Sequence, residues 1–149
     1  MTYTYQSMAL SFVETVSTPT ILLYSVAIAA LLIYLPFFVV GYGRLKAGYN
    51  SSAPRAQFDQ LPPYAQRATW AHQNAFESFM IFAAAALMAY VTQQTSSLVA
   101  IAALAYLAAR SLYPIFYILD VPWARSMMFG VGNLGIITLF VISLRSLVL

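Results

Sequence analysis

The sequence predicts an all-α membrane protein that folds as a bundle of four transmembrane helices. Apolar and aromatic residues make up 62% of the chain and charged residues only 7%, whereas a soluble globular domain carries roughly 25% charged residues. The apolar residues are gathered in charge-free runs that reach, or nearly reach, the length needed to cross about 30 Å of hydrocarbon. These observations exclude a water-soluble globule and favour a single transmembrane domain over residues 1–149.

The first helix is expected over about residues 19–43, around the charge-free run from Ile21 to Val40. Twenty residues at 1.5 Å each span about 30 Å, so this run is long enough by itself. Pro36 lies within the run and predicts a kink or a pore-side face; membrane helices tolerate an isolated proline when neighbours satisfy the freed carbonyl. The polar, proline-containing stretch over residues 44–66 then predicts a loop.

The second and third helices are expected over about residues 68–92 and 97–119, as a hairpin that turns at Thr92–Ser97. The apolar arms beside this turn reach only about 21 Å and about 18 Å, so each helix must include its polar flank. Glu77 and Arg110 then lie at nearly the same depth. Because an isolated charge at that depth is costly, we expect an ion pair between them.

The fourth helix is expected over about residues 123–147, after a break at Pro122–Trp123. Its charge-free run begins at Met127 and is bracketed by Arg125 and Arg145. The four predicted helices account for the apolar mass of the chain. We find no inverted repeat of the kind that marks many transporters, so a small transporter or channel has less support.

The few charges collect near two of the three loops. The first loop region carries Arg44, Lys46, Arg55 and Arg67, the third lies between Asp120 and Arg125, and the second has no charge. The bias of basic residues toward the cytoplasm therefore places the first and third loops inside and both termini outside. Seven dispersed basic residues make no nucleic-acid footprint. With no cysteine and one histidine, no metal site is expected either.

Helical periodicity places polar residues on shared faces. On the second helix Trp70 aligns with the candidate residues, His72 lies opposite, and Ser126 follows Arg125 on the fourth helix. Arginines beside a carboxylate and an amide suit a ligand with several carboxylates and a free amine. Apolar surroundings would admit a lipophilic small-molecule substrate from the membrane lipids. The candidate binding residues are Arg44, Arg67, Asn74, Glu77, Arg110, Tyr113 and Tyr117.

Some of these residues also have a purely structural interpretation. Lys46, Arg55 and Arg145 fit ordinary interfacial anchors, and Trp123 fits an aromatic belt. Arg44 is compatible with either an anchor or a ligand contact. His72, facing away from the candidate residues, fits a hydrogen-bonded polar residue better than a catalytic base.

Three segments together resemble the family of membrane-associated proteins in eicosanoid and glutathione metabolism, the MAPEG family. The first is Arg67 to Glu77, with its Ala-His-x-Asn-x-x-Glu pattern, and the second is Arg110 to Tyr117 followed by Arg125-Ser126. The third, Gly41 to Lys46, resembles the end of the family's first helix. The resemblance covers roughly residues 20–147. The segment Asn50 to Arg55 is similar to a loop of bacterial members, so the chain looks like a bacterial-type relative of the microsomal glutathione transferases.

This resemblance implies a homotrimer that binds glutathione, as the thiol co-substrate, between neighbouring protomers near the cytoplasmic side. Arg125 and Ser126 would be the catalytic residues, because a cation and a hydroxyl donor beside the sulfur favour the thiolate. The implied function is a membrane-bound glutathione-dependent transferase or peroxidase acting on lipophilic electrophiles or lipid hydroperoxides. The implied glutathione contacts are Arg44, Asn74, Glu77, Tyr117 and Arg125, with Arg110 in support.

Three positions depart from the family pattern. Trp70 stands where glutathione-using relatives usually have arginine, Gln73 takes a position that is often basic, and Phe129 replaces a frequent tyrosine. Each lost charge-assisted contact would weaken binding by about 1.5–3 kcal/mol. These departures favour the alternative function, a non-catalytic lipid-binding or scaffold member of the same fold.

Overall fold

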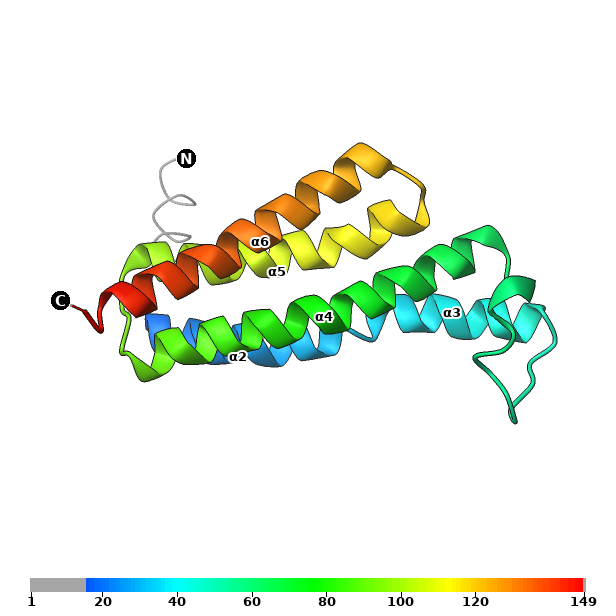
Figure 1. Cartoon of the computed structure of the whole chain (residues 1–149), viewed down its shortest axis with the longest axis horizontal. Helices are drawn as coiled ribbons and strands as arrows, with labels where there is room; N and C mark the ends of the chain where they lie inside the picture. Colours follow the sequence, from blue (N-terminus) through cyan, green and yellow to red (C-terminus); the bar gives the residue numbers. More distant parts are fainter. Residues whose placement is uncertain (1–15, 149) are drawn as a thin grey trace, which may run out of the picture.

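The computed structural model describes residues 16–148, which form a bundle of long helices with short connections (Figure 1). Four helical spans are long and apolar enough to cross a membrane, the first being the broken helix Thr18–Lys46. The predicted all-α fold with four membrane helices is thereby confirmed. The helices are α2 (Thr18–Leu32), α3 (Leu35–Lys46), α4 (Pro63–Val91), α5 (Ser97–Ile118) and α6 (Pro122–Arg145).

The helix ends follow the sequence prediction closely, except at the start of α4. This helix begins at Pro63 rather than near residue 68, because Pro63 occupies the first turn, where proline's fixed φ and missing N–H are favourable. Its 29 residues span about 43 Å, more than the hydrocarbon requires. As expected, α4 and α5 include their polar flanks, which carry Asn74, Glu77 and Arg110 within the helices.

The break between α2 and α3 confirms the kink predicted at Pro36. Pro36 has no N–H to continue the helical ladder, and the chain makes a turn at Ile33 and Tyr34. The Nδ1 of His72 on α4 donates to the carbonyl of Ile33 at 2.8 Å. The His72 ring also packs at 5.2 Å from the rings of Phe37 and Phe76. His72 therefore stabilises the break between α2 and α3, which agrees with its interpretation as a hydrogen-bonded polar residue rather than a catalytic base.

The core lies where α2, α4, α5 and α6 meet, and small residues dominate it. Ala85, Ala89 and Ala103 are fully buried there, so the helix backbones approach closely. The rings of Phe82 and Tyr106 stack at 3.7 Å within this core. The Tyr106 hydroxyl satisfies its hydrogen bonding with Ser78, at 3.2 Å.

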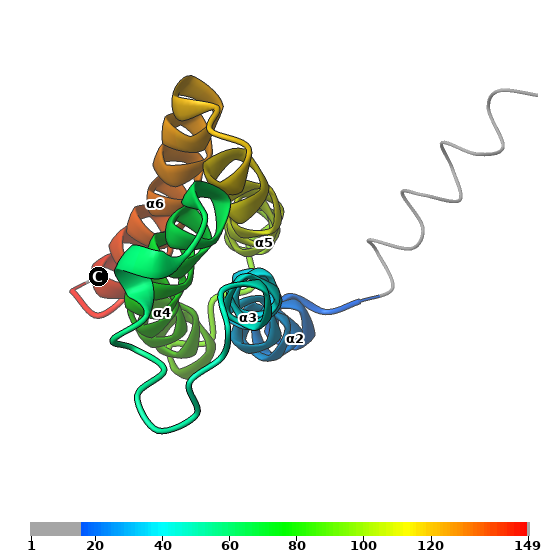
Figure 2. The ribbon, with the colours of Figure 1, turned by 90° about the vertical axis from the view of Figure 1, so that its right-hand side faces the viewer.

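At the end of the bundle that carries the first loop, the α5–α6 hairpin diverges from α3 and α4. Figure 1 shows this divergence on the right, and Figure 2, which looks from that side, shows α6 and α3 on different sides of α4. Arg67 of α4 joins the two diverging parts of the bundle, α3–α4 and α5–α6. Its Nε donates to the Ile118 carbonyl at 3.0 Å, and its Nη1 lies 3.5 Å from an Asp120 carboxylate oxygen. These contacts connect α4 to the C-terminal end of α5 at the end of the bundle where the helices diverge.

Gly135→Ala is expected to lower the melting temperature of the detergent-solubilised protein by several degrees. An added Cβ would lie 2.7 Å from the Ala102 carbonyl oxygen, so α6 would have to move away from α5, and overpacking costs about 1–3 kcal/mol. Gly130→Ala on the same helix is the matched control, because its Cβ would meet nothing within 4 Å. Equal melting temperatures for the two variants would contradict the close α5–α6 contact.

Candidate functional site

Two surface hollows adjoin each other where the α5–α6 hairpin diverges from α4. Tyr113 and Tyr117 of α5 line both hollows, so they form one continuous depression, which we call the tyrosine groove. The hollows measure about 290 and about 450 Å³. The other residues of the groove are Arg125, Ser126 and Phe129 on α6 and Trp70, Gln73, Asn74 and Glu77 on α4.

Arg125 is the cation of this groove. Its guanidinium carbon lies 4.6 Å from the centroid of the Tyr117 ring, and the exposed Ser126 follows it. The only ion pair within residues 16–148 joins Arg67 and Asp120, so Arg125 has no carboxylate partner there. Both groove residues stand near the N-terminus of α6, where unpaired N–H groups and the helix dipole also favour an anion. This corner of the groove can therefore stabilise a negative charge.

Arg110 lies beneath the groove rather than in it. Its side chain is only 6% exposed and lies among the rings of Tyr106, Tyr113 and Phe129, at 5.2–5.7 Å from their centroids. Its Nη1 donates to Oδ1 of Asn74 at 2.8 Å. That bond orients the amide, leaving its Nδ2 as the donor available to a ligand in the groove. Arg110 thus acts on the site through Asn74.

The expected ion pair between Glu77 and Arg110 is wrong. The guanidinium is bonded to Asn74, one turn before Glu77, while Glu77 is exposed at the edge of α4. A neutral amide is less costly to bury beside the aromatic rings than a carboxylate. Glu77 consequently has no ion-pair partner within the described part of the chain, and its carboxylate is available to a cationic group of a ligand.

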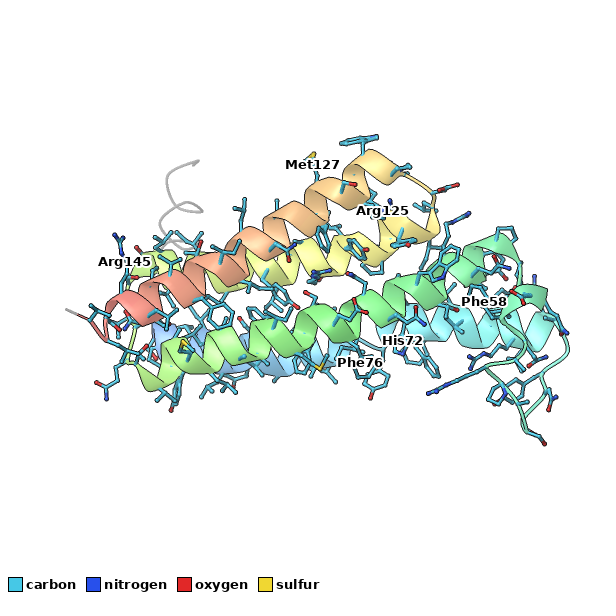
Figure 3. All side chains as sticks on the ribbon, in the orientation of Figure 1. Phe58, His72, Phe76, Arg125, Met127 and Arg145 are labelled. Carbon is cyan, nitrogen blue, oxygen red and sulfur yellow. The ribbon has the colours of Figure 1, made fainter. Side chains whose placement is uncertain are left out.

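Besides Arg110, two of the candidate binding residues, Arg44 and Arg67, do not line the groove. The Arg67 guanidinium is engaged by Ile118 and Asp120. Arg44 lines a different hollow, between α3, α4 and the loop over residues 47–62. Figure 3 shows this arrangement, with Phe58, His72 and Phe76 of that hollow on one side of α4 and Arg125 on the other. The structure thus brings together Asn74, Glu77, Tyr113, Tyr117, Arg125 and Ser126.

Trp70 has a contact that the periodicity did not indicate. Its ring lies 5.6 Å from Phe58, in the short 3₁₀ helix Phe58–Gln60 of the first loop, and 6.5 Å from Tyr117. The indole is 43% exposed and covers one end of the groove. Helical spacing places Trp70 on the correct face, but the pairing with Phe58 depends on the shape of a loop, for which the sequence gives no periodic signal.

Comparison with known protein families gives one match, to a model described as the MAPEG family, over residues 21–145. The match includes all of α3, α4, α5 and α6 and nearly all of α2. No curated protein and no solved structure gave a match. The family match therefore adds evidence about function to the geometry of the groove.

Asn74→Asp is expected to raise the melting temperature by a few degrees and to weaken the binding of an anionic ligand in the groove at least tenfold. The new carboxylate would give Arg110 a charge-assisted bond in place of a neutral one, but it would remove the Nδ2 donor and repel carboxylates of the ligand. Thermal unfolding and calorimetric titration measure the two effects. Gln73→Glu, exposed on the preceding residue, is the control for added charge, and a drop in melting temperature confined to Asn74→Asp would contradict the Arg110 contact.

Proposed function

The chain belongs to the MAPEG family, and on this premise we propose that it is a membrane-bound glutathione-dependent transferase or peroxidase acting on lipophilic electrophiles or lipid hydroperoxides. The observation that carries the proposal is Arg125, a guanidinium that forms no ion pair within residues 16–148, stands beside Ser126 near the N-terminus of a membrane helix and faces the groove. Ionisable residues kept within membrane spans without an internal partner mark functional sites.

The groove offers matching groups to much of the glutathione molecule. Arg125 and Ser126 would hold the sulfur as a thiolate, Glu77 would accept from the ammonium group, and the Asn74 amide would donate to a carboxylate. The Tyr117 hydroxyl supplies a further polar contact along the groove. These assignments follow the residues that line the groove.

The chemistry requires a polarisable nucleophile beside an apolar substrate. In conjugation, the thiolate sulfur forms a bond to an electrophilic carbon while the leaving group departs with its electron pair. In peroxide reduction, the thiolate attacks the terminal peroxide oxygen and the O–O bond breaks, giving a sulfenic acid and an alkoxide that takes a proton from water to leave as the alcohol. A second glutathione thiol then forms a disulfide with the sulfenic acid and releases water. Met127 and Trp123 are exposed on the outer side of the α6 start, where a lipophilic substrate can arrive from the bilayer.

The two carboxylates of glutathione need more cations than one groove contains. Among the residues that the structure describes, Arg125 and Glu77 are the charged ones in its lining. We therefore include a homotrimer in the proposal, in which Arg44 of a neighbouring copy supplies a further guanidinium. We also retain the orientation with the first and third loops in the cytoplasm, because the basic residues of the first loop lie at the groove end of the bundle and only Arg145 lies at the other.

A non-catalytic lipid-binding or scaffold protein of the same fold is the alternative. The observation that favours it is Trp70, whose ring covers one end of the groove between Phe58 and Tyr117. Phe129 adds a second apolar ring to the lining, 6.4 Å from Tyr113. A groove with two such rings suits an acyl chain as well as a peptide.

Arg125→Ala is expected to reduce turnover of a chlorodinitrobenzene-type electrophile about a hundredfold, because removing one donor to a developing or bound anion has an effect of that size. Calorimetric titration of glutathione into the purified protein measures binding beside activity. Arg145→Ala, which removes an exposed arginine at the other end of the bundle, should leave both unchanged. If the wild-type protein neither binds glutathione nor turns over the electrophile, the non-catalytic lipid-binding or scaffold function replaces the proposed enzymatic one.

Trp70→Arg is expected to tighten glutathione binding about tenfold. The change adds a cation at the α4 end of the groove, where Glu77 is the charged residue in the described lining. The matched control is Trp123→Arg, which adds the same charge at an exposed tryptophan outside the groove lining. Titration calorimetry of both variants provides the comparison. An equal change in the two affinities would mean that Trp70 does not border the ligand.

A further inference from the structure

The turn between α5 and α6 brings a carboxylate close to the cation of the tyrosine groove. Asp120 lies in this turn, and Arg125 follows in the first turn of α6. Both residues contact Tyr117: the Asp120 N–H donates to its carbonyl at 3.2 Å, and the Arg125 guanidinium carbon lies 4.6 Å from the centroid of its ring. The Asp120 side chain is 66% exposed, so it has room to change direction.

In the structure the Asp120 carboxylate is engaged by Arg67 instead. The start of α4 lies at the same end of the bundle as this turn (Figure 1), and Arg67 reaches across from α4. Its Nη1 lies 3.5 Å from Oδ2 of Asp120, while its Nε donates to the Ile118 carbonyl at 3.0 Å. No other ion pair is present among residues 16–148. The carboxylate of the turn is therefore paired with Arg67 and not with Arg125.

The turn has backbone hydrogen bonds that do not involve Arg67. The Val121 N–H donates to the Phe116 carbonyl at 2.9 Å, and the Val121 carbonyl accepts from the Arg125 N–H at 3.1 Å. Asp120 has a φ of 60°, a left-handed conformation in which Asp and Asn are enriched. These bonds hold the backbone of the turn, so the contact with Arg67 mainly determines the direction of the Asp120 side chain.

A released Asp120 carboxylate would change the electrostatics of the groove. Paired with Arg125, it would occupy guanidinium donors and offset the positive charge that favours an anion there. Among the described residues of the lining, Glu77 already balances the charge of Arg125. A second carboxylate would therefore give this region an excess of negative charge, which disfavours a thiolate.

We propose that Arg67 is a positioning residue for the glutathione reaction: it holds the Asp120 carboxylate away from Arg125 and so keeps the Arg125 guanidinium free for the thiolate. This inference rests on the proposed function, in which Arg125 stabilises the sulfur anion. Arg67 itself does not line the groove and touches neither the ligand nor the reacting atoms. It acts through the carboxylate that it binds.

The test measures thiolate formation in the full-length protein saturated with glutathione, by ultraviolet absorbance across a pH titration. Arg67→Gln is expected to raise the pH midpoint by about one unit, because a neighbouring charge shifts a pKa by that much or more. Asp120→Asn alone should leave the midpoint near the wild-type value, and the double variant Arg67→Gln/Asp120→Asn should restore it. Arg145→Gln, at the other end of the bundle, is the matched control. Exposed ion pairs contribute little to stability, so all variants should fold.

Two results would overturn the proposal. The midpoint could be unchanged in Arg67→Gln, or its shift could persist in the double variant, which would mean that Arg67 maintains the shape of the turn instead. A second measurement needs no glutathione: nitrogen-15 NMR of the arginine side chains follows the Nε–H of Arg125, assigned by its loss in Arg125→Lys.

This NMR signal separates the inference from the proposed function. It should move in Arg67→Gln and return in the double variant, whether or not glutathione binds. A wild-type protein that binds no glutathione would contradict the proposed function. An Arg125 signal that is identical in wild type and Arg67→Gln would contradict the role of Arg67, because Asp120 would then not reach Arg125 when released.

Discussion

The structure depends on how it accommodates Arg110 inside an apolar bundle. A guanidinium in that position must keep hydrogen-bond partners or pay a large desolvation cost, and here it has one hydrogen bond to Asn74 and three aromatic rings around it. Gly132 makes room for it, since a Cβ at that position would lie 3.3 Å from the Arg110 Nε. The same contacts fix the faces of α4, α5 and α6 toward one another. The tyrosine groove opens directly above them.

The open end of the bundle is joined by contacts that run from the first loop to the candidate catalytic residues. Phe58 of the loop packs on Trp70, Trp70 on Tyr117, and the Tyr117 ring lies under the Arg125 guanidinium. Arg67 ties the same helix to the end of α5. The first loop is therefore connected to the Arg125 end of the groove through packed side chains.

The sequence predicts the helices well because their signal is local. Charge-free runs, the proline at position 36 and the polar turn at Thr92–Ser97 determine where helices form, kink and end. Periodicity also places Asn74 and Tyr117 on faces that meet in the groove. It does not predict which of two neighbouring polar residues a long side chain reaches, so the partner of Arg110 is Asn74 and not Glu77.

The position of Arg44 illustrates a second reason why the sequence does not predict every contact of the site. A shared depth in the membrane suggests that basic residues converge, but depth says nothing about the angle around the bundle. Arg44 closes the first helix at the inner end and yet lines the hollow between α3, α4 and the loop over residues 47–62, a loop held in shape by hydrogen bonds of Gln57 and Gln66. These long-range and loop-dependent contacts have no counterpart in the spacing of residues along the chain.

The distribution of charge explains why the proposed glutathione site needs a second copy of the chain. Arg125 and Glu77 can balance the thiolate and the ammonium of glutathione, which leaves two carboxylates that need cations in a poorly solvated groove. Within residues 16–148, the arginines at this end of the bundle that form neither an ion pair nor a buried amide contact are Arg125, Arg44 and Arg55. In the proposed homotrimer, Arg44 of a neighbouring copy supplies a cation to one of these carboxylates. The hollow that Arg44 lines would then face the groove of the next copy, so that one binding site would be built from two chains.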